Sequence, residues 1–220
     1  MLMPGLSLAK INSILCLGSH ADDIEIGCGG AILDLLAVNP QVSVHWCIFS
    51  GGTQRDTEAR HSAARFLQQA AGKTVEVFEF RDSFFPDQWG RIKETIADLA
   101  KRVQPDLIFS HRLEDRHQDH RVIAELTWCA FRDHLILEYE IPKYEGDLGQ
   151  PNVFWPLSAD LCEQKIAILQ DCFPSQESKP WFDGELFRSL LRLRGSECNS
   201  PTKYAEAFYC RKATVAPASV

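Results

Sequence analysis

Two short stretches of this sequence gather histidines and aspartates at spacings that suit a metal centre. In the first, His20 and Asp23 stand three residues apart, with Asp22 between them. An imidazole nitrogen and a carboxylate oxygen on a tight loop can be aimed at one small cation. Asp22 is then left over. A carboxylate that lies beside two metal ligands without being bound is what a metal hydrolase needs as a general base.

The second stretch lies about ninety residues further on. Within ten residues it holds three of the chain's seven histidines and two aspartates: His111, Asp115, His117, Asp119 and His120. Together with the first pair, His120 completes two nitrogens and one carboxylate with open positions, which suits a catalytic Zn²⁺. We expect His117 to donate to a leaving amine or to stabilise an oxyanion. We expect Asp119 to orient His117 and keep it protonated.

Both stretches also have purely structural interpretations. Asp22 or Asp23 could cap the helix that follows, because aspartate is a favoured capping residue. His111 or His117 could hydrogen-bond the backbone of a loop, and Asp115 or Asp119 could cap the next helix. The residue types alone leave the roles of His111 and Asp115 open.

The segments that must position these residues alternate between strand and helix patterns. Apolar runs predict strands at 11–17, 42–49, 74–78 and 105–110, and helical periodicity predicts helices at 29–38, 57–71 and 91–103. This rhythm is typical of an α/β fold, with a Rossmann-like, mostly parallel sheet flanked by helices. Each histidine stretch follows a predicted strand. The carboxyl ends of parallel strands meet at one edge of a sheet, so the two stretches should converge there.

Three glycines follow the first stretch, Gly27, Gly29 and Gly30. They form neither a phosphate-binding P-loop nor a dinucleotide fingerprint. We expect them to let the backbone turn tightly between strand and helix, and to bring the helix close to the sheet.

After residue 133 the alternation loosens. A strand is predicted at 135–141, an exposed loop at 143–150, helices at 159–169 and 183–193, and a last strand at 204–209. No linker or composition shift marks a boundary. The sequence therefore predicts a single domain over residues 1–220 with an elaborated C-terminal part.

Composition excludes several classes of function. The formal net charge is −7 and no basic block is present, so neither nucleic acid nor an anionic membrane is an expected partner. The eight cysteines form no C-x-x-C pair, and we interpret them as reduced thiols of a cytoplasmic enzyme. Met1–Lys10 lacks the pattern of an export signal, and no apolar run is long enough to span a membrane.

These motifs resemble those of a known family. His20-Ala21-Asp22-Asp23 with Gly27-Cys28-Gly29-Gly30, and later His117-Gln118-Asp119-His120, are similar to the signatures of PIG-L/LmbE-type zinc-dependent N-deacetylases. Arg55-Asp56-Thr57-Glu58, Pro105-Asp106 and Lys203–Phe208 are also similar to family segments. Ala21 departs from the family, which usually has proline there. That change affects the stiffness of the loop and removes no ligand atom.

The resemblance implies residue roles. His20, Asp23 and His120 would bind Zn²⁺ or another divalent metal, and Asp22 would be the general base. His117 would act as acid or oxyanion donor with Asp119 as its partner, and Arg55 would contact substrate hydroxyls. Arg55 also has a plain interpretation, as a helix-start arginine paired with Asp56 or Glu58.

The resemblance further implies a reaction, the removal of an N-acetyl group from an N-acetylglucosamine-type conjugate with release of acetate. The partner would be a small amino-sugar, and a homo-oligomer stays open. The same site could instead cleave another amide, in a thiol conjugate or a larger N-acyl group. Two further alternatives are a non-haem iron oxygenase and a metal-binding module without catalysis. The aromatic loop Phe84–Trp89 could line a pocket or fill the core.

Overall fold

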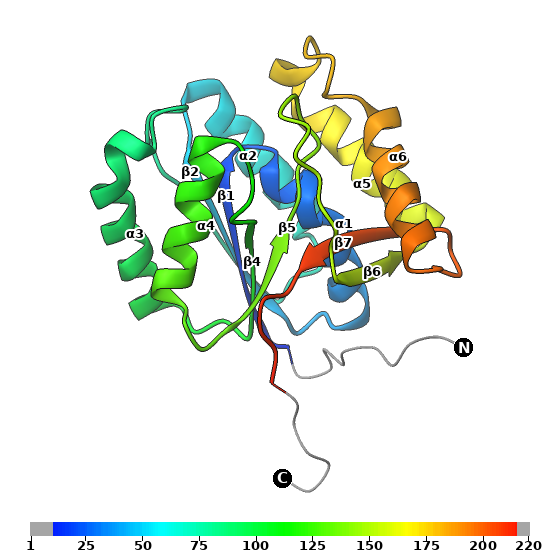
Figure 1. Cartoon of the computed structure of the whole chain (residues 1–220), viewed down its shortest axis with the longest axis horizontal. Coiled ribbons are helices and arrows are strands. Elements are labelled where there is room, and N and C mark those ends of the chain that lie inside the picture. Colours follow the sequence, from blue (N-terminus) through cyan, green and yellow to red (C-terminus); the bar gives the residue numbers. More distant parts are fainter. Residues whose placement is uncertain (1–10, 215–220) are drawn as a thin grey trace, which may run out of the picture.

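A seven-stranded sheet in the order β3-β2-β1-β4-β5-β7-β6 runs through residues 11–214, the part of the chain that this computed structural model describes (Figure 1). The strands are β1 (Ser13–His20), β2 (Ser43–Ser50), β3 (Gly72–Val77), β4 (Leu107–His111), β5 (Leu135–Tyr139), β6 (Val153–Leu157) and β7 (Tyr204–Tyr209). The first five strands pair in parallel, and β7 is antiparallel to both β5 and β6. The predicted mostly parallel sheet is confirmed.

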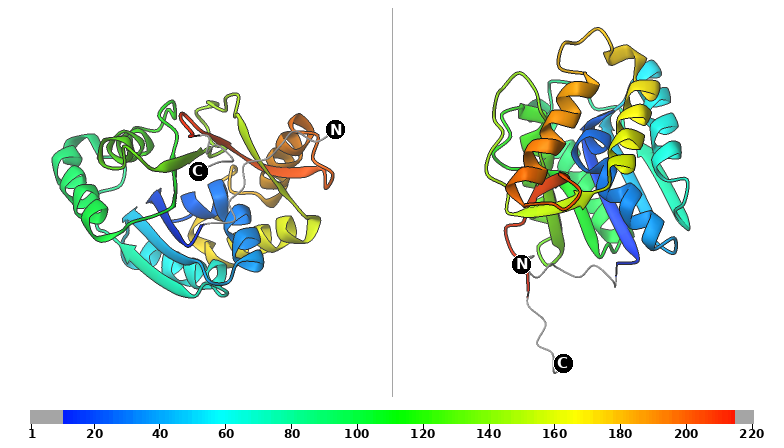
Figure 2. Two further views of the ribbon diagram at one scale, coloured as in Figure 1. Left: turned by 90° about the horizontal axis from the view of Figure 1, so that it is seen from below. Right: turned by 90° about the vertical axis from the view of Figure 1, so that its right-hand side faces the viewer.

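Helices cover both faces of the sheet. They are α1 (Asp23–Val38), α2 (Thr53–Phe66), α3 (Trp89–Arg102), α4 (Gln118–Ala130), α5 (Ala159–Cys172) and α6 (Gly184–Glu197), with short 3₁₀ turns η1 (Pro86–Gln88) and η2 (Pro174–Gln176). Helices α1, α2 and α5 pack together on one face, and α3 and α4 on the other (Figure 2). Helix α6 packs against β7. The architecture is therefore α/β, with the chemistry-bearing loops at one edge of the sheet.

Strand β1 is central because its sequence is apolar toward both helix layers. Ile14 and Cys16 belong to the core beneath α1 and α2, while Leu15 and Leu17 belong to the core beneath α3 and α4. All four are fully buried. A strand covered on both faces needs such a continuous apolar run. This burial fixes the register of His20, the last residue of β1, at the edge of the sheet.

Helix α1 begins at Asp23, six residues earlier than the glycines predicted. Gly27 and Gly30 lie inside it, although glycine destabilises a helix interior by roughly 1 kcal/mol relative to alanine. A Cβ at Gly27 would lie 2.2 Å from the Tyr139 ring, and one at Gly30 would lie 2.4 Å from the Leu157 side chain. Close packing on the sheet thus overrides helix propensity. Asp23 consequently stands in the first helical turn and not in a loop.

The C-terminal part contains one strand that the sequence did not predict. Strand β6 is the last in the sheet order and pairs with β7 alone. It contains Pro156. Proline has no backbone N–H, and an edge strand tolerates it because such a strand has a hydrogen-bonded neighbour on one side only. The predicted loop over 143–150 carries no strand or helix. The antiparallel pair β6–β7 is the elaboration that follows the parallel sheet.

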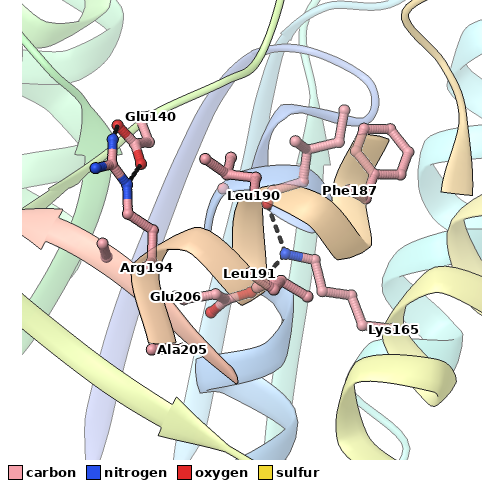
Figure 3. A pocket seen from close by; sticks show the side chains of 11 residues that line it. Glu140, Lys165, Phe187, Leu190, Leu191, Arg194, Ala205 and Glu206 are labelled. Atoms are coloured by element: carbon pink, nitrogen blue, oxygen red, sulfur yellow. Dashed lines mark hydrogen bonds and ion pairs between the residues drawn. The ribbon is translucent and has the colours of Figure 1, made fainter. Parts of the chain in front are cut away.

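Two buried ion pairs fasten the C-terminal part to the rest of the fold, one of them to α1 (Figure 3). The Lys165 ammonium donates to Glu206 at 2.6 Å and to the carbonyl of Ile26 at 2.6 Å. Nearby, the Arg194 guanidinium makes two hydrogen bonds to Glu140, at 2.6 and 2.8 Å. These residues line a cavity of only about 20 Å³ beside α6, which has room for about one water molecule. We refer to these four charged residues as the Lys165–Glu206 cluster.

Two remaining expectations concern membrane-spanning segments and the redox state of the cysteines. No helix within residues 11–214 is long and apolar enough to cross a membrane. Met1–Lys10, on which the expectation about an export signal rests, lies outside the described residues. All eight cysteines are free thiols, as their spacing predicted.

Candidate metal centre

Three residues from the two histidine stretches bring donor atoms together at the carboxyl edge of the sheet. The Nδ1 of His20 lies 3.3 Å from the Nε2 of His120 and 3.4 Å from a carboxylate oxygen of Asp23. The other Asp23 oxygen lies 3.5 Å from the Nε2 of His120. His20 ends β1, Asp23 opens α1, and His120 stands in the first turn of α4. The structure therefore brings together the three residues that the sequence proposed as ligands.

The spacing of these atoms fits a small divalent cation. Ligands bound at about 2.0–2.1 Å in a tetrahedral zinc site are roughly 3.3 Å from one another. The separations of 3.3, 3.4 and 3.5 Å are close to that value pair by pair, with one Asp23 oxygen facing His20 and the other facing His120. Two imidazoles and one carboxylate also leave a position open, as in catalytic sites. The donor set is thus compatible with Zn²⁺ or with another divalent metal that accepts nitrogen and oxygen ligands.

Two further imidazoles lie within ligand distance of the same set. The ring of His111 stacks on the ring of His120, with centroids 3.9 Å apart, and is fully buried. Its Nε2 accepts a hydrogen bond from the Ser19 backbone N–H at 3.0 Å, so that lone pair is already used. His117 caps the N-terminus of α4, where its Nδ1 accepts from the Asp119 backbone N–H at 3.3 Å. The Nε2 of His117 is the free end of that ring.

Asp22 is held apart from the three donor atoms. It precedes α1 with a φ of 110°, in the left-handed region, and its side chain makes no capping hydrogen bond with the helix. Its Oδ1 lies 3.1 Å from the Arg55 guanidinium. Its Oδ2 is buried and has no hydrogen-bond partner among the described residues. Burial raises the pKa of Asp22 to about 6, with Arg55 opposing the shift. A carboxylate with a free lone pair and a pKa near neutrality can accept a proton.

The electrostatics of two ligands suit metal binding. Burial lowers the pKa of His120 to about 3, and the neighbouring His111 adds to the effect, so the ring is neutral at physiological pH. Burial alone would raise the pKa of Asp23, but the imidazoles of His120 and His111 outweigh it and hold that pKa well below its usual range. A neutral imidazole and an ionised carboxylate are the forms that bind a cation. For His20, burial is outweighed by the carboxylates of Asp119, Asp23 and Asp82, which raise its pKa, so a bound metal must displace a proton from this ring.

Asp119 does not orient His117 as we expected. Its carboxylate accepts from the Nε2 of His20 at 3.1 Å and from the backbone N–H groups of Ser83 and Phe85 at 2.7 and 3.1 Å. Moreover, burial lowers the pKa of His117, so this ring is not held protonated. The loop after β3, which donates those amides, draws the carboxylate toward His20 instead. Asp119 therefore orients a proposed metal ligand, as outer carboxylates often do.

Arg55 lies at the same edge of the sheet, on α2. Besides Asp22, its guanidinium contacts Glu58 at 3.3 Å and the Ser175 hydroxyl at 3.2 Å, and also reaches the Ala21 carbonyl. The pairing with Glu58 that we had considered is present. The contact with Asp22, which the sequence did not indicate, links Arg55 to the candidate base.

The site opens into a cleft of about 510 Å³. Several of its walls come from segments that the sequence did not identify: Asp82 and Ser83 after β3, Lys143–Glu145 after β5, and Gln176, Lys179 and Trp181 before α6. Asp82 lies 3.2 Å from the Nε2 of His20. Phe85 of the aromatic loop is fully buried, whereas Phe84 is partly exposed. Only proximity to the carboxyl edge could have indicated these loops, because their composition is ordinary.

Comparison with known proteins places the chain among deacetylases and related folds. Residues 15–131 match the family model described as GlcNAc-PI de-N-acetylase, PIG-L. The uncharacterized deacetylase YaiS of Escherichia coli K12 is 27% identical over 173 residues, which cover 74% of this chain and 92% of YaiS. The matched family segment contains both histidine stretches and therefore every proposed ligand.

Solved structures share the fold at lower identity. N,N'-diacetylchitobiose deacetylase from Pyrococcus horikoshii superimposes with a TM-score of 0.71 at 19% identity, covering 92% of this chain and 84% of that one. GalB, the 4-carboxy-2-hydroxymuconate hydratase of Pseudomonas putida KT2440, gives 0.74 at 20% identity, covering 96% and 100%. A deacetylase and a hydratase thus share this architecture, so the fold by itself does not select the reaction.

Proposed function

This chain belongs to the GlcNAc-PI de-N-acetylase (PIG-L) family, and from that premise we propose that it is a metal-dependent N-deacetylase. The reaction would be hydrolysis of the acetamido group of an N-acetylglucosamine-type conjugate, giving acetate and a free amine. The observation that carries the proposal is the convergence of His20, Asp23 and His120 at 3.3–3.5 Å beside a carboxylate with an unused lone pair.

His20, Asp23 and His120 would hold the metal, with Zn²⁺ as the first candidate. A divalent metal bound there supplies a Lewis acid, which makes water nucleophilic near neutral pH and polarises an amide carbonyl. Asp119 would keep the His20 ring in place through its Nε2. The protein's own groups must then move the protons.

Asp22 is the group that would accept the proton of the attacking water. Its buried Oδ2 is free for that hydrogen bond, while Arg55 holds its Oδ1. The same carboxyl can then return the proton to the amine nitrogen as the C–N bond breaks, so that amide and water become acetate and amine. A pKa of about 6 suits both steps, because it lies close to the working pH.

His117 would stabilise the developing oxyanion. Since its Nδ1 accepts a backbone hydrogen bond, the neutral ring carries its proton on Nε2. An N–H donor pointing into the site can hydrogen-bond the carbonyl oxygen as negative charge develops on it. Of the two roles that the sequence suggests for His117, this is the oxyanion role, and it does not require Asp119 as a partner.

The cleft supports a sugar-conjugate substrate. Its walls combine charged and amide groups with Trp181 and Tyr144, a mixture that suits hydroxyl groups and the apolar face of a sugar ring. We propose that Arg55 contributes to hydroxyl recognition from its place on the wall as well as holding Asp22. The free cysteines support a cytoplasmic location.

The test is acetate release from a panel of N-acetylglucosamine conjugates. Zinc-loaded protein should release acetate, a chelated sample should not, and added zinc should restore the rate. The best conjugate would indicate the class of aglycone. If N-propionyl or thiol-linked amides are cleaved while all N-acetyl sugars are refused, the alternative amidase is correct. If no amide is cleaved by fully metal-loaded protein, the deacetylase proposal fails.

A further inference from the structure

A buried carboxylate on the far side of His120 has no part in the function proposed above. The Oδ2 of Asp115 lies 3.0 Å from the Nδ1 of His120, on the edge of the ring opposite the proposed metal. The same oxygen accepts a hydrogen bond from the Lys143 ammonium at 2.9 Å. We propose that Asp115, clamped by Lys143, is the positioning residue that fixes the tautomer and orientation of His120. The inference rests on the proposed metal centre.

The direction of each hydrogen bond supports this assignment. An ionised carboxylate only accepts, so Nδ1 of His120 must carry the proton that faces Asp115. Nε2 of His120 is then left with its lone pair, and this is the atom that faces His20 and Asp23. A ligand histidine whose second nitrogen donates to a carboxylate is held in the correct tautomer and made a stronger donor to the metal.

The second oxygen of Asp115 holds the main chain of His117. Its Oδ1 accepts from the backbone N–H of His117 at 2.8 Å, immediately before α4 begins. One carboxylate therefore fixes the main chain that carries His117 and the ring of His120. Residues 115–120 become a single unit, in which a shift of Asp115 would move both imidazoles.

Lys143 keeps this carboxylate charged and in place. Asp115 is fully buried, and a buried charge is tolerated only when it is paired. Lys143 supplies the opposite charge from the loop after β5, with its own side chain only 9% exposed. Asp147 from the same loop binds the ammonium at 2.8 and 2.9 Å and also accepts from the Arg116 backbone N–H at 2.6 Å. The loop after β5 is thus bound to the loop that precedes α4 from two sides.

Zinc affinity, measured by competition with a coloured chelator, tests the inference without requiring turnover. Asp115→Asn should bind zinc 10- to 100-fold more weakly, on the order of what loss of an outer carboxylate costs. The Co²⁺-substituted protein should also show altered visible absorption bands, which report ligand geometry. Asp106→Asn is the matched control, because Asp106 also accepts two backbone amides, from Asn12 and Ser13, but at the opposite end of β1.

Lys143 variants keep the test decisive if Asp115→Asn does not fold. Lys143→Met should weaken zinc binding by several-fold and change the Co²⁺ bands, whereas Lys143→Arg, which keeps the charge, should recover most of the affinity. Wild-type affinity and unchanged bands in Asp115→Asn, or in Lys143→Met when the first is unfolded, would overturn the inference. So would an equal loss in Asp106→Asn. Zinc binding that depends on Asp115 in a protein releasing no acetate would leave the inference standing and remove the proposed function.

Discussion

Two groups of buried charges lie along helix α1, and they are satisfied to very different degrees. In the Lys165–Glu206 cluster the Glu206 oxygens accept from the backbone amides of Gly30 and Ala31, each at 2.7 Å, as well as from Lys165. At the start of α1, Asp22 keeps one buried oxygen without a partner among the described residues and adopts a left-handed backbone conformation. The same helix therefore carries a fully paired cluster in its middle and an underpaired one at its N-terminus.

This difference in hydrogen bonding indicates which cluster stabilises the fold and which one acts in catalysis. A buried polar network with every group paired rigidifies the structure around it. An orphaned acceptor and a strained backbone are unfavourable, by about 1–3 kcal/mol each, and such features concentrate at functional sites. The Lys165–Glu206 cluster should accordingly control stability, and the cluster around Asp22 should control activity.

The largest expected effect is the loss of a metal ligand. His120→Ala removes one of three donors, and we expect the zinc content of purified protein to fall to near zero. Acetate release should drop by more than about 10³-fold, because the nucleophile and the carbonyl both depend on the metal. Metal analysis together with a rate assay checks this. Stoichiometric zinc in His120→Ala would mean that another imidazole, such as His117, is the third ligand.

Adjacent aspartates provide the next contrast. Asp22→Asn should retain zinc and lose about 10²- to 10⁴-fold in acetate release, because the ligands stay and the proton acceptor is gone. Asp23→Asn is the matched variant and should instead weaken zinc binding, since it removes an ionised ligand. Rates at saturating zinc and titrations of the metal-free proteins separate the two effects. A full-rate Asp22→Asn enzyme would exclude Asp22 as the base.

In the paired cluster the effect should be on stability. Lys165→Met leaves Glu206 buried without its counter-charge, which is expected to destabilise the protein by about 3–5 kcal/mol. Zinc affinity and the rate per folded molecule should be unchanged. Urea unfolding measures the loss. The double variant Lys165→Met/Glu206→Gln should recover part of it, because no unpaired charge remains. A fall in zinc affinity without a fall in stability would reverse the assignment of the two clusters.

The sequence predicted the ligand set well because topology alone brings it together. His20 and the segment before His120 each follow a buried parallel strand, and β1 and β4 are neighbours in the sheet. The predicted start of α1 was wrong. Helix propensity placed the glycines before the helix, whereas close packing against Tyr139 and Leu157 is possible with glycines inside it. Local pattern cannot report such a contact, since both partners lie more than a hundred residues away.

The partners of the site residues were the least predictable part. Asp119 turns toward His20 because the amides of Ser83 and Phe85 hold it there, and those amides come from a different loop. Lys143 reaches Asp115 from a segment that composition marks only as exposed loop. These contacts depend on how loops from three strands meet, which no single stretch of sequence encodes.

Glu25, two residues into α1, should have the smallest effect when substituted. It also tests directly whether the buried carboxylates at this end of the helix lack partners. It is fully buried, and both carboxylate oxygens lack a hydrogen-bond partner among the described residues. Burial raises its pKa from 4.5 to about 8. The folded protein then keeps a proton that the unfolded chain releases above pH 4.5. Stability should therefore fall as pH rises through that window.

Glu25→Gln removes this titration, so its free energy of unfolding should lack that pH slope. Relative to the wild type, the variant should gain about 3.5 kcal/mol between pH 5 and pH 8, because one retained proton changes the free energy of unfolding by up to about 1.4 kcal/mol per pH unit, and the change levels off near pH 8. Urea unfolding at four pH values measures the gain. Glu185→Gln on the exposed first turn of α6 is the control and should give a curve parallel to the wild type. If the curve of Glu25→Gln is also parallel to that of the wild type, Glu25 has a partner in solution. Asp22 alone then distinguishes the N-terminal end of α1 from its middle.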